Sequence, residues 1–209
     1  MIENYDEIQG WFGYEKHFDE LIELAQKRMS DNGAAGDKKP FPVVVEVGAW
    51  LGRSSFYLVE KHNTVAKIYV VDTWNGSQNE LDTFHALVKE RDIYIDFMKN
   101  MEKWHGKFTP VRTTSVSAAG MFDNGSVDFV FIDAEHTDAA VTADIAAWLP
   151  KLSPSGIIAG HDYHWEGVKA AVDRVFRPEG IRIDDVTWII ESPHESKIIY
   201  SGDMPNNSF

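Results

Sequence analysis

The sequence predicts an α/β domain whose largely parallel sheet is doubly wound, with an antiparallel hairpin at one edge. Runs of β-branched residues with almost no polar alternation indicate strands that are covered on both faces. Segments with helical periodicity separate these runs, as in repeated strand–helix–strand units with right-handed crossovers. The last two strand-like runs have no helix-sized gap between them, and strands joined so directly pair antiparallel.

Composition limits the possible functions. The 209 residues are 44% apolar and 12% aromatic, which suffices for one domain with its own core. Cysteine is absent, which excludes disulfides, cysteine zinc sites and thiol nucleophiles. The net charge of −13 repels phosphate backbones and anionic lipid, so we expect neither nucleic acid nor a membrane as partner. The first residues lack the features of a signal peptide, and the expected location is cytoplasmic.

Within one domain of residues 1–209, the segment 1–40 is expected to be helical and to precede a core at 41–209. Apolar residues recur every three or four positions and predict an amphipathic helix over 15–30. The stretch that follows is rich in Gly, Lys and Asp and is typical of a surface loop.

The other elements alternate along the chain. Strands are predicted at 41–47, 67–72, 107–111, 127–132, 156–160, 185–191 and 197–200. Helices, each with apolar residues on one face, are predicted at 54–62, 141–149 and 168–176, and a long helix or a helix pair is predicted at 81–101. The insertion at 79–103 either roofs a ligand site or serves as packing or a dimer face, and a homodimer is one expectation.

Acidic residues follow the strands at their carboxyl ends, where ligands bind in open sheets of this kind. They are Glu46, Asp72, Asp133 and Asp162. The first turn spaces Gly48 and Gly52 as GxxxG and lacks the middle glycine that lets a backbone approach a pyrophosphate. Asp72 follows 24 residues after Gly48, where a carboxylate can bond a ribose diol. Together these features favour S-adenosylmethionine over NAD. Alone, the turn is equally typical of tight strand-to-helix packing, and Asp72 is more typical of a helix N-cap or a solvated turn.

Three stretches carry a resemblance to a known family. The runs VVVEVGAWLGRSS and YVVDTWNGS, and above all the segment from VDFVFIDAEH to GHDYHWEGVKAAVDRVF, resemble class I S-adenosylmethionine-dependent methyltransferases of the small-molecule O-methyltransferase type. They are most similar to the group with macrocin-type sugar O-methyltransferases and cephalosporin-hydroxylase-like proteins. The resemblance covers about residues 42–176 and implies a Rossmann-like, seven-stranded sheet with one antiparallel edge strand.

The resemblance also implies which residues bind the cofactor. They are Glu46, Gly48, Ala49, Gly52, Ser54, Ser55, Asp72, Thr73, Trp74, Ser115 and Asp133. The first turn would shape the methionine pocket, and a serine at 54 or 55 would lie near the methionine carboxylate. Asp72 would hold the ribose, Trp74 and Ser115 would flank the adenine, and Asp133 would lie near the sulfonium. A short match at residues 10–12 resembles a segment that covers the cofactor in some relatives.

In catechol- and macrocin-type relatives, a divalent ion lowers the pKa of the acceptor hydroxyl. The matching ligand positions are Asp133, His161 and Asp162. His161 replaces an oxygen ligand, and because Mg prefers oxygen whereas Mn and Fe accept imidazole, the identity and use of a metal stay open. Three alternatives remain: a metal at these residues, His136 or His161 as a metal-free base beside Asp133, or histidines that only hold loops.

The sequence therefore predicts an O-methyltransferase that moves a methyl group from S-adenosylmethionine to a hydroxyl of a small acceptor, such as a sugar or a phenol. Two other functions remain as alternatives. One is a non-methylating, cephalosporin-hydroxylase-like protein of the same fold, and the other is an NAD-linked oxidoreductase.

Overall fold

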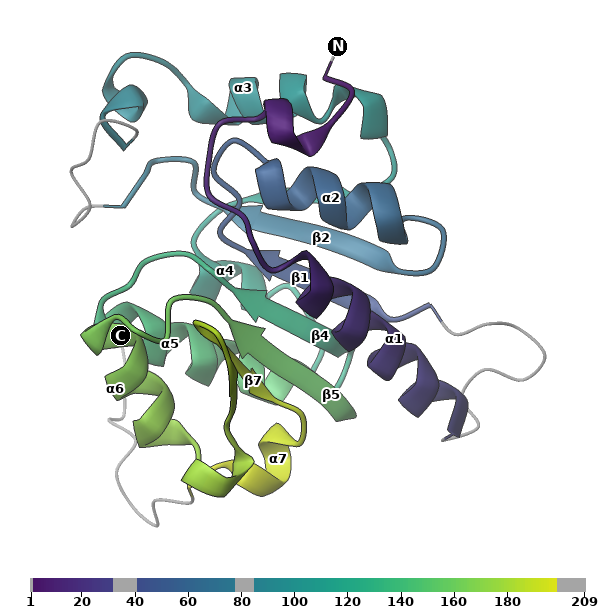
Figure 1. Cartoon of the computed structure of the whole chain (residues 1–209), viewed down its shortest axis with the longest axis vertical. Helices are drawn as coiled ribbons and strands as arrows, with labels where there is room; N and C mark the ends of the chain where they lie inside the picture. Colours follow the sequence, from purple (N-terminus) through teal and green to yellow (C-terminus); the bar gives the residue numbers. More distant parts are fainter. Residues whose placement is uncertain (1, 32–40, 78–84, 199–209) are drawn as a thin grey trace.

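The computed structural model describes residues 2–31, 41–77 and 85–198, which form a twisted sheet with helices on both faces (Figure 1). The strands are β1 (Val43–Val47), β2 (Lys67–Asp72), β3 (Thr109–Arg112), β4 (Val127–Ile132), β5 (Leu152–Gly160), β6 (Arg182–Asp184) and β7 (Thr187–Ile190). Their order in the sheet is β3-β2-β1-β4-β5-β7-β6. The first five pair in parallel, and β7 lies antiparallel between β5 and β6. The predicted fold class is confirmed, and the winding reverses between β1 and β4.

Helices of the described residues follow the strands in alternation. The α-helices are α1 (Glu15–Asp31), α2 (Arg53–His62), α3 (Ile93–Asn100), α4 (Ser115–Ala119), α5 (Asp138–Trp148), α6 (Glu166–Val175) and α7 (Pro193–Ser196). Short 3-10 helices are η1 (Tyr5–Glu7), η2 (His85–Lys89), η3 (Glu102–Trp104), η4 (Leu149–Lys151) and η5 (Pro178–Gly180). None of the described helices is long and apolar enough to cross a membrane.

Both faces of the sheet are buried, as the absence of polar alternation in the strands predicts. Successive side chains of β1 point to opposite faces, so Val44 and Val45 belong to different apolar clusters. The first cluster joins α1, α2 and α3 to one face, and α1 runs across β4 and β5 (Figure 1). The second cluster joins α4, α5 and α6 to the other face. Because Phe18 and Leu21 of α1 are fully buried in the first cluster, the N-terminal helix is part of the core.

The sequence predicts a long helix or a helix pair over 81–101, and the described part of this insertion between β2 and β3 is divided. The start of the insertion lies partly in residues 78–84, outside the described part of the chain. The described part forms η2 and α3, and Asp92 caps α3 by accepting a hydrogen bond from the Tyr94 N–H at 3.0 Å. A capping aspartate favours a helix start at its own position, so apolar periodicity alone overestimates the helix.

The closing hairpin lies earlier than predicted. The sequence predicts strands at 185–191 and 197–200, but β6 pairs with β7 across a tight turn in which Asp185 has a φ of +57°. A Pro one position inside α7 suits the first turn of a helix, so the chain after β7 becomes helical. Lys197 then makes an isolated antiparallel bridge, and positions 199 and 200 lie outside the described residues.

Candidate active site

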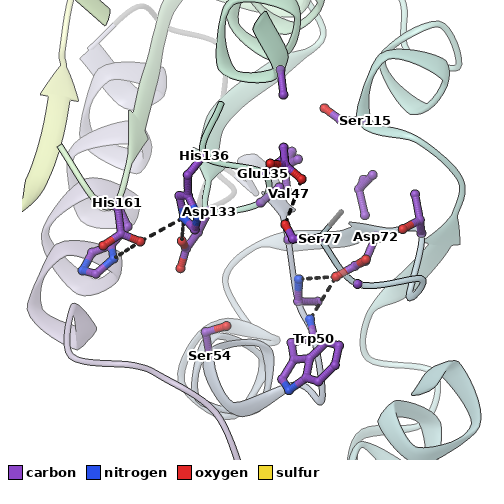
Figure 2. A pocket seen from close by; sticks show the side chains of 18 of the residues that line it. Val47, Trp50, Ser54, Asp72, Ser77, Ser115, Asp133, Glu135, His136 and His161 are labelled. Carbon is purple, nitrogen blue, oxygen red and sulfur yellow. Dashed lines mark hydrogen bonds and ion pairs between the residues drawn. The ribbon is translucent and has the colours of Figure 1, made fainter. Parts of the chain in front are cut away.

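The carboxyl ends of the parallel strands open into a cavity of about 1050 Å³ (Figure 2). This volume is slightly above the usual range for small-molecule sites, about 300 to 1,000 Å³. Five acids among the described residues line it: Asp72, Asp133, Glu135, Asp144 and Asp162. Among the described lining residues the permanently charged base is Arg53. The cavity therefore favours a ligand that carries positive charge near these acids.

Close packing requires glycine at both glycine positions of the first turn. Gly48 has a φ of +91°, and a Cβ at this position would lie 1.8 Å from the carbonyl oxygen of Asp133. Gly52 has a φ of +92°, and its Cβ would lie 2.9 Å from the Phe97 ring. Only glycine allows β1 and β4 to end this close together. Gly48 lines the cavity with Ala49, whereas Gly52 is outside the lining.

The Asp72 carboxylate holds the first turn in place. Its Oδ2 accepts hydrogen bonds from the N–H groups of Ala49 and Trp50 at 2.8 and 2.9 Å, and its Oδ1 accepts one from the Trp74 N–H at 2.7 Å. A carboxylate offers about four acceptor positions, so about one remains for a ligand. Asp72 and Thr73 line the cavity, and the free position suits a single hydroxyl rather than both hydroxyls of a diol.

Three predicted cofactor residues lie behind the cavity lining. Glu46 is fully buried and accepts hydrogen bonds from the Ser54 and Ser55 hydroxyls, each at 2.5 Å. Of these serines, Ser54 lines the cavity and Ser55 does not. Trp74 is 2% exposed, and its Nε1 donates to the Trp50 carbonyl oxygen at 2.8 Å. Glu46, Ser55 and Trp74 thus support the lining from behind, and the adenine-flanking position predicted for Trp74 is inside the core.

Two acids and two histidines meet where β4 and β5 end, and Figure 2 labels three of them, Asp133, His136 and His161. His136 Nε2 lies 3.0 Å from Asp162 Oδ2 and 3.7 Å from Asp133 Oδ1. His161 Nδ1 lies 3.3 Å from the same Asp162 oxygen. Asp162 has a φ of +58°, an uncommon backbone conformation that functional sites often hold. We call these four residues the rim cluster.

Within the rim cluster, the set that fits a metal ion differs from the predicted one. Ligand atoms of Asp133, His136 and Asp162 all lie within 4.8 Å of one another. His161, predicted as the third ligand, instead packs its ring 4.9 Å from the Tyr14 ring. His136 follows Asp133 by three residues, and the loop after β4 turns both side chains toward Asp162. The conformation of this loop cannot be predicted from the spacing of the residues in the sequence.

Charge stabilises the ionised form of Asp162. Burial alone would raise its pKa, but hydrogen bonds with His136 and His161 hold the pKa of Asp162 well below its usual range. Burial alone would lower the pKa of His161, yet its hydrogen bond with Asp162 and the charge of Asp133 raise it. The rim cluster therefore keeps an ionised carboxylate that can bind a cation.

Tyr14 is a site residue that sequence reasoning missed. Its hydroxyl donates to Asp133 Oδ2 at 2.8 Å, and the tyrosine is 2% exposed. Burial and the nearby charge of Asp133 raise the pKa of Tyr14 well above its usual value, so it stays a donor. Tyr14 comes from the N-terminal segment, and no local pattern marks it. The only hint in the sequence is the nearby match at 10–12, of which Gly10 and Trp11 line the cavity.

Another group of polar side chains lies apart from the rim cluster. The Ser77 hydroxyl donates to Glu135 Oε2 at 3.0 Å. Asp144, on α5, is 6% exposed and lines the cavity with Ser115. Of these four residues the sequence predicts Ser115 only. None of the described residues of the insertion after residue 84 lines the cavity, so this part of the insertion does not roof it.

Comparisons with known proteins agree with this fold. A family model described as a methyltransferase domain matches residues 45–163, more than half of the chain. Among curated proteins, the uncharacterised protein y4gI of Sinorhizobium fredii is 30% identical over 122 residues. The match covers 57% of this chain and 13% of that protein, so the chain spans a small part of this relative's length.

Solved structures of low identity have the same fold. CalS11, a TDP-rhamnose 3′-O-methyltransferase of calicheamicin biosynthesis, is 15% identical with a TM-score of 0.54, over 85% of this chain and 77% of that chain. The O-methyltransferase NovP is 15% identical with a TM-score of 0.56, over 84% and 79%. Cofactor-bound Rv0187 from MTB is 13% identical with a TM-score of 0.56, over 90% and 86%.

The family match includes the first turn, Asp72 and the whole rim cluster. This match supports the predicted methyltransferase family, and it gives no support to the NAD-linked alternative. This chain belongs to the methyltransferase-domain family and has the fold of the class I S-adenosylmethionine-dependent methyltransferases.

Proposed function

We propose that the protein transfers the methyl group of S-adenosylmethionine to a hydroxyl of a small molecule, with the help of a divalent metal ion. One observation carries the proposal: the rim cluster and the turn held by Asp72 open into the same cavity. A methyl donor on one side and a group able to ionise an alcohol on the other are what such a transfer needs. The names of CalS11 and NovP support oxygen as the acceptor atom.

The cavity suits the cofactor in size and charge. Its volume leaves room for the cofactor and an acceptor together. The acids of the lining complement a positively charged sulfonium. The N-terminus of α2, which begins after Gly52 without a side-chain cap, supplies N–H donors for the methionine carboxylate, with the Ser54 hydroxyl beside it.

The metal would be held by Asp133, His136 and Asp162. Two carboxylates and one imidazole suit Mn or Fe better than Mg, which prefers oxygen ligands throughout. A divalent ion bound there would lower the pKa of the acceptor hydroxyl. His161 bonds the Asp162 oxygen and Tyr14 bonds Asp133, and such contacts orient metal ligands.

Two exposed indoles indicate the kind of acceptor. Trp11 is 56% exposed and Trp165 is 44% exposed, and both line the cavity. The Trp165 ring lies 4.8 Å from the ring of His136, next to the rim cluster. Flat apolar indole faces pack well on planar or ring-shaped molecules. We therefore favour sugar or phenolic hydroxyls as acceptors, in keeping with the sequence prediction.

The test measures methyl transfer from S-adenosylmethionine to a panel of sugars and phenols, with and without EDTA. We expect transfer that EDTA abolishes and that Mn²⁺ restores better than Mg²⁺. The Asp162→Ala variant should bind S-adenosylhomocysteine but lose Mn²⁺ binding by calorimetry. The control is Asp123→Ala, an exposed acid outside the cavity lining, which should keep both.

Two results would contradict the proposal in different ways. Full turnover in EDTA would contradict the metal-assisted mechanism and would favour a histidine as the general base. Binding of S-adenosylhomocysteine without transfer to any hydroxyl would favour the non-methylating alternative.

A further inference from the structure

One residue of the set that fits a metal ion lies within a loop. His136 lies between β4 and α5, three residues after Asp133. Its Nε2 faces Asp162 Oδ2 at 3.0 Å and Asp133 Oδ1 at 3.7 Å. The last torsion of a histidine side chain has a broad energy profile, so rotamer preference alone does not fix the plane of the ring. The orientation of this imidazole therefore depends on what packs against it.

The helix α6 holds the backbone of this loop. Gly167, in the first turn of α6, packs so closely that a Cβ there would overlap the His136 carbonyl oxygen and lie 2.8 Å from the Asp138 nitrogen. Near the other end of α6, Arg174 donates two hydrogen bonds to the Asp138 carboxylate, at 2.7 and 2.6 Å. The whole helix packs along α5 (Figure 1). The loop is thus fixed to α6 at two points.

Trp165, the residue before α6, contacts both loops of the rim cluster. Its N–H donates to the carbonyl oxygen of Asp162 at 2.9 Å. Its ring centroid lies 4.8 Å from that of the His136 ring, and the two planes are inclined by 32°. Rings packed at this distance attract each other, and the contact restricts rotation of the smaller ring. One residue therefore joins the loop after β4 to the loop after β5.

Helix stability does not explain a tryptophan at this position. Trp165 is the N-cap of α6, where Ser, Thr, Asp and Asn are preferred because their side chains accept a hydrogen bond from the first turn. An indole cannot accept it, and α6 begins without a side-chain cap. The indole is also 44% exposed. A residue that breaks a local rule beside a site is expected to serve the site.

We infer that Trp165 is a positioning residue for the metal ion, because its ring holds the His136 imidazole in the plane in which Nε2 faces the two carboxylates. Those carboxylates already have supporting contacts, from Tyr14 and from His161. Trp165 supplies the corresponding contact for the imidazole, and loss of such a contact weakens metal binding by about 10- to 100-fold. The inference rests on the proposed function and gives Trp165 a role besides packing on the acceptor.

Three variants at position 165 separate the ring from the helix cap. Trp165→Phe keeps a flat ring and should keep the Mn²⁺ affinity within about threefold. Trp165→Ala and Trp165→Ser remove the ring, and each should weaken Mn²⁺ binding about 10-fold by calorimetry. A serine also caps α6, so Trp165→Ser should unfold about 2 to 4 °C above Trp165→Ala yet bind Mn²⁺ no more tightly. A merely structural role would make Mn²⁺ affinity follow the unfolding temperature.

A second change shows whether Trp165 acts through the imidazole. His136→Ala removes the ligand and should itself weaken Mn²⁺ binding at least about 10-fold. In that background Trp165→Ser should weaken it further by less than about twofold, because the group that the indole holds is gone. Trp11→Ser makes the same change at the other exposed indole of the lining and should keep the Mn²⁺ affinity. All variants should bind S-adenosylhomocysteine like the unaltered protein, which shows that the cavity is intact.

The possible failures are distinguishable. If Trp165→Ala and Trp165→Ser bind Mn²⁺ as tightly as the unaltered protein, the inference is wrong and metal-assisted transfer stands. An equal further loss in the His136→Ala background also overturns it, because Trp165 would then act on another group. If the unaltered protein binds S-adenosylhomocysteine but no Mn²⁺, the proposed metal fails, and the positioning role of Trp165 fails with it.

Discussion

A carboxylate without solvent exposure lies under the cavity. Glu46 accepts hydrogen bonds from Ser54 and Ser55, yet burial outweighs these bonds and raises its pKa to about 7. Near neutral pH the group is thus partly protonated in the folded protein. An acid with a raised pKa stabilises the fold most at low pH, below its unfolded pKa, and this contribution is lost as pH rises through the folded pKa.

This pKa predicts a pH-dependent stability that Glu46→Gln should remove. Between about pH 4.5 and pH 7 the folded chain keeps a proton that the unfolded chain has released. The free energy of unfolding should therefore fall by about 1.4 kcal/mol per pH unit from this group, about 3 kcal/mol in all. Urea unfolding of both proteins at pH 5 and pH 7.5 measures the difference. Parallel pH profiles for the two proteins would show that Glu46 is ionised throughout.

Single site residues were predictable from the sequence where they directly follow a recognisable strand. Asp133 and Asp162 follow buried strands directly, and a sequence can reveal such positions. Tyr14 and Asp144 reach the cavity from the N-terminal segment and from the middle of a helix, so only tertiary packing brings them there. Tyr14 and its partner Asp133 are 119 positions apart in sequence. His136 joins Asp133 and Asp162 in the group that could hold a metal ion for the same reason, because loop conformation decides which side chains meet.

At the scale of elements, the first turn depends on its neighbours on both sides. Asp72 of β2 bonds its N–H groups, and the backbone after β4 touches the position where a Gly48 Cβ would lie. The turn therefore packs directly against the end of β4, from which Asp133 of the rim cluster follows. A change in the turn should displace Asp133 as well.

Gly48→Ala should be strongly destabilising, and Gly106→Ala should separate the causes. Both glycines have a positive φ, +91° and +77°, but a Cβ at Gly106 meets nothing within 4 Å. Gly106→Ala should cost about 1 kcal/mol for backbone conformation alone. Gly48→Ala adds a clash with the backbone of Asp133, and we expect at least about 2 kcal/mol more. Thermal unfolding measures both, and equal losses would mean that β4 does not constrain the turn.

Elements with strong periodicity were predicted well, and those decided by a single residue were not. The five parallel strands and the helices α1, α2, α5 and α6 were predicted from apolar patterns, whereas the short helix α4 was not predicted. The helix cap at Asp92 divides the insertion, and the positive φ of Asp185 fixes the position of the hairpin turn. Neither effect can be recognised from a hydrophobic pattern. The antiparallel pair is therefore present as predicted but is formed by β6 and β7.

For the whole molecule, the reversal of winding between β1 and β4 brings the first turn, Asp72 and the rim cluster to one cavity. The strand order spreads the cavity across the sheet, from the rim cluster after β4 and β5 to Ser115 after β3. The acids of the lining and the net charge of −13 both favour a positively charged cofactor over a polyanionic one.

Calorimetric titration of the unaltered protein with S-adenosylhomocysteine and with NAD tests this account most directly. The first turn lacks the glycine that a pyrophosphate requires, so we expect S-adenosylhomocysteine to bind at least roughly 100-fold more tightly than NAD. Tight binding of NAD, with no heat from S-adenosylhomocysteine, would contradict an adenosyl site at the strand ends.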